Sequence, residues 1–163
     1  MVSGDETNDR VRVEFQFKQE DGWPPVASEV LWAVPIDVDL VRIDNVPWFV
    51  RDLSLNDTVR TRAGARGALQ FVEKVSWSGN CTVRIILYES GEFPGGPNGI
   101  IGAFARLGVQ AEGIEKFGMI SLNVPPSADI LGIKGLLARG SEADWWDYEE
   151  SCIGNAWANS NPH

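Results

Sequence analysis

The sequence predicts an α+β protein in two parts: a small antiparallel β-barrel-like half at residues 11–79 and a ferredoxin-like half at residues 80–153. Up to residue 79, short segments of alternating apolar and polar residues are separated by tight turns. No helical pattern lies between them, which is typical of a small barrel or a strongly bent sheet. From residue 80, strand and helix patterns follow in the order β-α-β-β-α-β, in which two helices cover one face of a four-stranded antiparallel sheet.

The strands of the first half are recognised by their period of two. Apolar residues at positions 11, 13, 15 and 17 alternate with charged or amide residues, which indicates a half-buried strand. Further strands are expected at 30–34, 40–43, 58–61 and 68–77, bounded by turn signals such as Asn56-Asp57. The longest of them should place on one face Leu69, Phe71, Glu73, Val75 and Trp77.

The second half has expected strands at 82–88, 109–112, 118–124 and 145–153. The glycine- and proline-rich segment 91–99 is interpreted as a flexible connection. Apolar residues at helical spacing follow it as far as Leu107, where Gly108 is a natural C-terminal cap. A second helix should take Ser127 as its N-cap and end at Gly140.

Composition and charge narrow the classes of partner. The chain has 163 residues, 44% of them hydrophobic and 23% charged, which is normal for a globular protein. Its net charge of −9 repels phosphate backbones and anionic membranes, so a basic partner is favoured over nucleic acid. The sequence contains neither a signal peptide nor a run of roughly 18 apolar residues, so we expect a cytoplasmic protein. Residues 1–10 are expected to be a disordered lead-in and residues 154–163 a tail.

The sequence contains no recognisable catalytic or cofactor motif. The only histidine, His163, stands at the end of the chain, so a nucleophilic pair with Cys152 has less support than a buried thiol. There is no Cys-x-x-Cys pair, histidine cluster or EF-hand loop, and segment 91–99 lacks the Gly-Lys-Ser/Thr ending of a phosphate-binding loop. We therefore expect no cofactor and no metal.

Two pairings depend on the fold. Cys81 opens the first strand of the second half and Cys152 closes the last. These strands are neighbours in a ferredoxin-like sheet, so the two thiols could lie close together, although the sequence does not decide this; in a cytoplasmic protein they are expected to be reduced. Acid–base chemistry needs two carboxylates within reach of one substrate. The candidate pairs are Asp44 with Asp57 and Glu149 with Glu150.

An acidic, aromatic patch is the first candidate binding surface. Between residues 142 and 150 there is no Lys or Arg, and carboxylates alternate with aromatic rings. In an extended strand, Trp145 lies on the face opposite to Trp146, so one ring can stay at the surface beside the carboxylates. Such a patch suits a basic partner, while the alternative is that both indoles cover the junction between the halves. The candidate contact residues are Asp144, Trp145, Asp147, Glu149 and Glu150.

Four arginines of the first half form the second candidate surface. Arginine binds phosphate and carboxylate groups in a bidentate manner, and these side chains could surround one rim of a small barrel. Few aromatic residues for base stacking stand near them, so ordinary solvated arginines are the competing interpretation. The candidate anion-binding residues are Arg51, Arg60, Arg62 and Arg66.

Seven short stretches distributed over residues 11–154 carry a family resemblance. They are Val11-Arg-Val-Glu-Phe, Trp23-Pro-Pro-Val, Glu29-Val-Leu-Trp-Ala, Arg42-Ile-Asp-Asn-Val-Pro-Trp-Phe, Leu55-Asn-Asp-Thr-Val, Val124-Pro-Pro-Ser-Ala-Asp and Trp146-Asp-Tyr-Glu-Glu-Ser-Cys-Ile-Gly. In order and spacing they resemble an uncharacterised bacterial family, domain of unknown function 4265. This resemblance implies a single unit from a bacterial source and brings no activity and no catalytic residues with it.

The leading functional hypothesis is a non-catalytic protein-interaction module of antitoxin, immunity or adaptor type, which presents the acidic, aromatic surface to a basic partner. The first alternative is a small-molecule-sensing regulatory module of ACT-like type, because the segment from Val83 to Glu112 has a strand–helix–strand pattern. The second alternative is nucleic-acid binding through the arginines, for which the acidic net charge is unfavourable.

Overall fold

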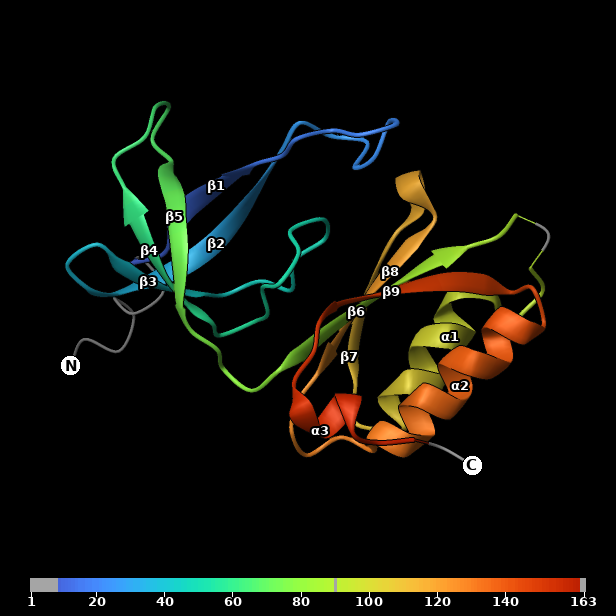
Figure 1. Cartoon of the computed structure of the whole chain (residues 1–163). Helices are drawn as coiled ribbons and strands as arrows, with labels where there is room; N and C mark the ends of the chain where they lie inside the picture. The colour runs from blue at the N-terminus through green and yellow to red at the C-terminus, as the bar shows by residue number, and fades with distance from the viewer. Residues whose placement is uncertain (1–8, 90, 162–163) are drawn as a thin grey trace, which may run out of the picture. The chain divides into compact units, whose positions relative to one another are not determined.

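The computed structural model describes residues 9–89 and 91–161, and the chain divides into two compact units, residues 1–78 and 79–163 (Figure 1). The first unit holds a closed five-stranded barrel and the second a four-stranded sheet with helices, so the predicted α+β class and small barrel are confirmed. None of the helices in the described ranges is long and apolar enough to cross a membrane. Residues 1–8 of the expected lead-in, and His163, lie outside the described residues.

The barrel is formed by five strands that pair in chain order. Antiparallel pairing joins each strand to the next, and β1 lies parallel to β5, which closes the sheet and leaves no free edge. Alternate side chains point inward and form the buried core, which includes Val13, Phe15, Leu31, Ile43 and Val59. The strands are β1 (Val11–Gln16), β2 (Ser28–Asp37), β3 (Leu40–Ile43), β4 (Thr58–Arg62) and β5 (Leu69–Ser76).

Strand β5 does not keep the single apolar face that its sequence predicts. The pairing of β4 with β5 shifts register twice, at Thr58/Val59 and at Arg60/Thr61. Phe71 still packs on the core, with its ring centroid 4.8 Å from that of Phe15, but Val75 is 45% exposed. The expected face is therefore wrong beyond Phe71, because irregular pairing breaks the period of two on which the prediction rested.

Two buried carboxylates hold the long loop between β3 and β4, which contains no helix or strand. The Glu29 carboxylate accepts hydrogen bonds from three consecutive backbone N–H groups, those of Trp48, Phe49 and Val50, at 2.7, 3.0 and 3.0 Å. Buried backbone donors need partners, and this loop cannot find them in a sheet ladder. The acidic side chain on β2 therefore fixes the shape of the loop.

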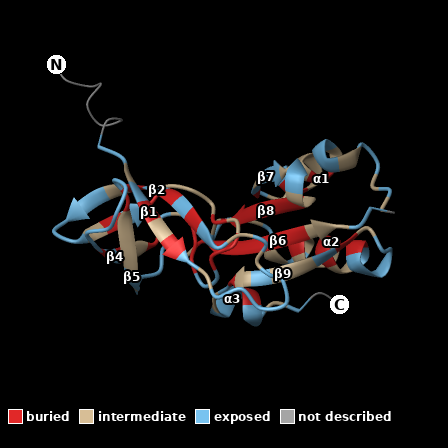
Figure 2. Ribbon diagram, turned by 90° about the horizontal axis from the view of Figure 1, so that it is seen from above, coloured by how far each residue is buried: buried red, intermediate tan, exposed pale blue. Residues whose placement is uncertain are grey.

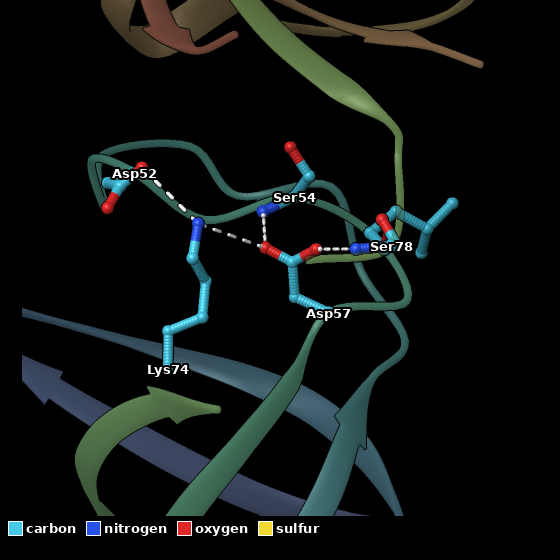
Figure 3. A network of polar contacts seen from close by, with 6 residues as sticks. Asp52, Ser54, Asp57, Lys74 and Ser78 are labelled. Carbon is cyan, nitrogen blue, oxygen red and sulfur yellow. Dashed lines mark hydrogen bonds and ion pairs between the residues drawn. The ribbon is translucent and has the colours of Figure 1, made fainter. Parts of the chain in front are cut away.

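Asp57 makes the second anchor (Figure 3). Its two oxygens accept from different donors, the backbone N–H of Ser54 at 2.8 Å and that of Ser78 at 2.7 Å. Lys74 lies between Asp57 and the exposed Asp52, at 3.9 and 3.3 Å. Burial raises the pKa of Asp57, and the hydrogen bonds from Ser78 and Ser54 oppose that shift. Both oxygens serve the backbone, so the suggested acid–base pair with Asp44 is replaced by a structural role for Asp57.

Replacing Asp57 by Asn should lower the free energy of unfolding by about 1–3 kcal/mol, because one carboxylate oxygen becomes an amide that faces a backbone donor. Thermal or urea unfolding at neutral pH measures the change. Asp52→Asn is the control, since the Asp52 side chain is 83% exposed. Equal stability of wild type and Asp57→Asn would contradict the anchoring role.

The same pair of variants tests the pH dependence. The folded-state pKa of Asp57 is raised above its ordinary value of 3.8, so its contribution to stability is fully present below that pH. This contribution is lost as the pH rises through the folded-state pKa. The free energy of unfolding of wild type should therefore fall more steeply than that of Asp57→Asn as the pH rises from 3.8 towards neutrality. Parallel pH profiles would contradict the raised pKa.

The second unit is a four-stranded antiparallel sheet in the order β7-β8-β6-β9, with α1 and α2 on one face (Figure 1). The two central strands, β6 and β8, are buried along most of their length (Figure 2). The elements are β6 (Cys81–Leu87), α1 (Gly96–Ala105), β7 (Gln110–Ile114), a 3-10 turn η2 (Glu115–Phe117), β8 (Met119–Val124), α2 (Ile130–Glu142), β9 (Trp146–Cys152) and α3 (Asn155–Ala158).

Both helices differ at their ends from the sequence prediction. Helix α1 begins inside the segment that was expected to be a flexible connection, with its N-cap at Gly95 in the left-handed region (φ 83°). The N-cap of α2 is Asp129 instead of Ser127, and its side chain accepts from the Gly132 N–H at 3.0 Å. Gly140 does not end the helix, which continues to Glu142.

The side chain of Trp146 explains why residue 140 is a glycine. A Cβ atom at Gly140 would lie 2.0 Å from Cε2 of the Trp146 ring, which is fully buried. The indole N–H donates to the carbonyl of Leu137, one turn earlier in α2, at 3.1 Å. Gly140 is therefore required for packing. Because it has no side chain, the indole lies directly against the backbone of α2, a contact that we call the Trp146 seat.

Replacing Gly140 by Ala should lower the free energy of unfolding by about 2 kcal/mol or more, because an added methyl group must displace a buried ring. Gly135→Ala is the matched control in the same helix, where an added Cβ meets no atom within 4 Å. That change should raise stability by about 0.5–1 kcal/mol, since Ala favours the helix. Thermal unfolding of both variants measures this contrast, and equal effects would contradict the packing role.

Candidate functional site

The structure separates the carboxylates of the acidic patch from its tryptophans. Strand β9 is an edge strand, paired only with β6 among the described strands. Asp147 and Glu150 are exposed, Glu149 is half-buried, and Asp144 is exposed just before the strand in the left-handed region (φ 57°). We call these four residues the acidic edge: Asp144, Asp147, Glu149 and Glu150.

Two members of the acidic edge have structural partners. Glu149 forms an ion pair with Arg84 of β6 at 3.3 Å, and the same guanidinium donates to the Ser151 hydroxyl at 2.6 Å. Arg84 is 1% exposed, so removing Glu149 would weaken the pairing of a buried charge, which is costly. Glu150 accepts from the indole N–H of Trp157, at 2.6 Å, in α3. Asp147 accepts a hydrogen bond from the backbone N–H of its neighbour Tyr148 at 2.9 Å. Asp144 and Asp147 are therefore the exposed members of the acidic edge that a substitution can change without breaking a link to another element.

The electrostatic field of the acidic edge also acts on Tyr148. Burial raises the pKa of its phenol, and the neighbouring carboxylates of Glu150 and Asp147 act in the same direction.

The side chains of Glu149 and Glu150 lie on opposite faces of β9, as alternation predicts. They do not converge on one substrate position, so the geometry gives no support to an acid–base pair.

Trp145 lies in an apolar groove beside the helices. Its ring packs edge-on against Phe93, with centroids 5.0 Å apart, and lies 5.8 Å from the ring of Trp146. Trp146 is fully buried in the core of the unit and also contacts Phe104, at 6.1 Å between centroids. The two consecutive tryptophans thus have different roles: Trp146 supports the cluster, and Trp145 forms part of a surface.

This surface is the wall of a cavity of about 460 Å³, which we call the aromatic groove. Apolar side chains from α1, α2 and the segment before α1 line it, and two arginines complete the lining. A smaller cavity of about 210 Å³ shares Phe93 and Trp145 with it. The lining of the aromatic groove includes Phe93, Ala103, Arg106, Leu107, Leu136, Arg139 and Trp145.

The four arginines of the first unit do not form one patch. Arg60 pairs with Glu73 across β4 and β5 at 3.1 Å. Arg66 lies in the turn after β4, and its carbonyl accepts from the Arg12 guanidinium near the start of β1. Arg51 lines a separate cavity of about 430 Å³ together with residues at and beyond the far end of β1.

Arg62 is exposed at the end of β4, close to the turn that holds Arg66. Arg51 is thus at one end of the barrel strands and Arg66 at the other. The cavity beside Arg51 is lined by aromatic and charged side chains, including Phe17, Trp23, Phe49, Glu20 and Lys18. Its mixture of positive and negative groups does not select for an anion.

The two cysteines are free and buried, and they lie on paired strands, since Thr82 of β6 faces Cys152 of β9. Burial raises the pKa of the Cys81 thiol, and Cys152 is close enough to act in the same direction. A raised pKa disfavours the thiolate, so Cys81 is not activated as a nucleophile. Within residues 9–89 and 91–161, no group of three or more His, Cys, Asp or Glu side chains could hold a metal ion.

Sequence reasoning missed the aromatic groove because its parts are separated in the chain. Phe93 stands in a segment interpreted as a flexible connection, and the two arginines stand at the ends of different helices. The available signal was the scarcity of cations in residues 79–163, which hold five Lys and Arg residues against ten carboxylates. In a segment with so few cations, an arginine without an obvious structural partner is a candidate for ligand binding.

The comparisons with known proteins agree with the family resemblance. The family model of domain of unknown function 4265 matches residues 29–148. The chain is also similar to a hypothetical protein from Neisseria gonorrhoeae of known crystal structure, with 25% identity and a TM-score of 0.71. That match covers 90% of this chain and 95% of the other. No curated protein matches the chain.

Proposed function

The chain belongs to the family of domain of unknown function 4265, and we propose that it is a non-catalytic protein-interaction module of antitoxin, immunity or adaptor type. Its contact surface is the acidic edge, and its partner is a basic protein. The observation that carries this proposal is that β9 is an edge strand with exposed carboxylates at Asp147 and Glu150, and with Asp144 exposed just before it.

Backbone geometry supports an edge contact. On its outer side, β9 pairs with no other described strand, so a further strand can add there once the Tyr148 N–H exchanges its hydrogen bond to the Asp147 carboxylate for one to the partner. Proteins often protect such an edge from aggregation by placing charges on it. Here the same charges also select the partner. An added strand that carries Lys or Arg side chains would lie beside the carboxylates of the acidic edge and could form ion pairs with them.

The charge pattern supports a basic partner. From residue 140 to the end, the chain contains five carboxylates and no Lys or Arg. Complementary charge steers the encounter and raises the association rate, with a strong dependence on salt. The free thiols of Cys81 and Cys152 agree with a reducing compartment such as the cytoplasm, where we place this interaction.

The double variant Asp144→Lys/Asp147→Lys should abolish the contact without loss of the fold. Both side chains are exposed, whereas reversal of Glu149 or Glu150 would also break the links to Arg84 and Trp157. Affinity capture from a lysate of the source organism, read by mass spectrometry, should show a basic protein bound to wild type and absent from this variant.

Glu112→Lys/Glu115→Lys is the matched control, because it makes the same charge change on exposed residues at the opposite side of the sheet, in β7 and η2. It should retain the partner. A partner that binds wild type and both variants equally would contradict the proposal, as would an acidic partner.

A small-molecule-sensing module of ACT-like type is the second candidate. The order β-α-β-β-α-β and the strand order β7-β8-β6-β9 support a ferredoxin-like classification of the second unit, in which ligand-sensing modules are common. The observation that favours this candidate is the aromatic groove. Nucleic-acid binding gains no such support, since the four arginines of the barrel are distributed over both of its ends.

A further inference from the structure

We propose that the aromatic groove binds a small amphipathic carboxylate, a molecule with an apolar body and one acid group. This inference is independent of the contact at the acidic edge, which lies on different residues. Its basis is the combination of an apolar cavity with two arginines that have no partner in the described part of the chain.

The lining of the groove sets the chemistry of the ligand body. Phe93 and Trp145 offer ring surfaces, and Leu107, Leu136 and Ala103 offer aliphatic ones. None of these side chains can hydrogen-bond a polar body, apart from the indole N–H. A volume of about 460 Å³ is in the range of small-molecule sites and is too small for a folded partner.

The charges at the groove set the chemistry of the ligand head group. Three of the five cations in residues 79–163 are already engaged: Arg84 with Glu149, Lys134 with the carbonyl of Trp157, and Lys116 over the ring of Phe117. The other two, Arg106 and Arg139, both line the aromatic groove and are exposed. Neither guanidinium makes an ion pair or hydrogen bond with a residue that the structure describes.

A guanidinium beside an apolar surface pairs with a carboxylate through two parallel hydrogen bonds. Outside the groove, carboxylates outnumber cations across this unit, so the general field repels an anion. The acid group of a ligand in the groove is therefore bound by Arg106 and Arg139, while the apolar lining binds its body. A cationic ligand of the same shape meets repulsion at both.

The groove is formed before any ligand arrives. Trp146 is locked between Gly140 and the carbonyl of Leu137, and its ring supports both Phe93 and Trp145, at 5.8 Å in each case. The ligand does not have to order these rings on binding, which preserves affinity.

The direct test is isothermal titration of the full chain with decanoate, a carboxylate with a flexible apolar body, and with naphthalene-2-carboxylate, a rigid one. Decylammonium has the same chain as decanoate and the opposite charge. At least one carboxylate should bind with a dissociation constant below about 1 mM, and decylammonium should bind at least roughly tenfold more weakly than decanoate. Absence of binding by both carboxylates at that concentration would overturn the proposal.

Two variant pairs locate the site. Arg106→Gln/Arg139→Gln should weaken carboxylate binding by roughly tenfold or more, since each loses a charge-assisted contact. Lys116→Gln/Arg62→Gln removes the same net charge from exposed positions elsewhere and should bind as wild type does. Ala103→Phe, which fills the groove, should abolish binding, whereas Ala105→Phe on the exposed side of α1 should not.

Thermal unfolding separates this role from a purely structural one. Arg106 is the C-cap of α1 and Arg139 stands in the last turn of α2, where a positive charge offsets the helix dipole. If the arginines serve only the helix ends, Arg106→Gln/Arg139→Gln will lower the melting temperature and leave carboxylate affinity unchanged. That outcome would refute the proposal.

Discussion

The seat of Trp146 against α2 is the packing interaction on which the rest of the second unit depends. The indole occupies the space where any other residue at position 140 would carry a Cβ, and its N–H is bonded to the Leu137 carbonyl. This fixes the approach of β9 to α2 and gives different roles to the two residues that flank Trp146 in the chain. Trp145 is directed to the aromatic groove, while Asp147 is directed to the exposed side of the edge strand.

The barrel unit depends on a different constraint, the need of an irregular loop for hydrogen-bond acceptors. Glu29 and Asp57 together accept hydrogen bonds from five backbone N–H groups. Four of these are in the loop, at Trp48, Phe49, Val50 and Ser54, and the fifth is at Ser78, after β5. Asp57, a candidate for acid–base chemistry in the sequence, thus serves as an acceptor for the backbone. The carboxylates best placed to meet a partner are the exposed ones of Asp144 and Asp147.

Much of the fold could be predicted from residue patterns, and the errors have identifiable causes. The alternation in β1 and the apolar run of β6 were sufficient to place those strands, because each depends on local sequence. The inward face of β5 was not predictable, since its two register shifts are set by pairing with β4. Gly140 resembled a helix end because only the position of Trp146, six residues later, shows why a glycine is required there. The aromatic groove joins three distant segments, so its arginines could not be recognised together before the fold was known.

The Trp146 seat creates a preformed groove that is distinct from the acidic edge. Titration of the ¹⁵N-labelled chain with decanoate, followed by assigned amide and indole N–H resonances, is the decisive measurement. We expect saturable shifts at the Trp145 indole and at Ala103, Leu107 and Leu136, with those of Asp147 and Glu150 unchanged. Shifts confined to the acidic edge or spread over the barrel, or no shifts at all, would contradict it.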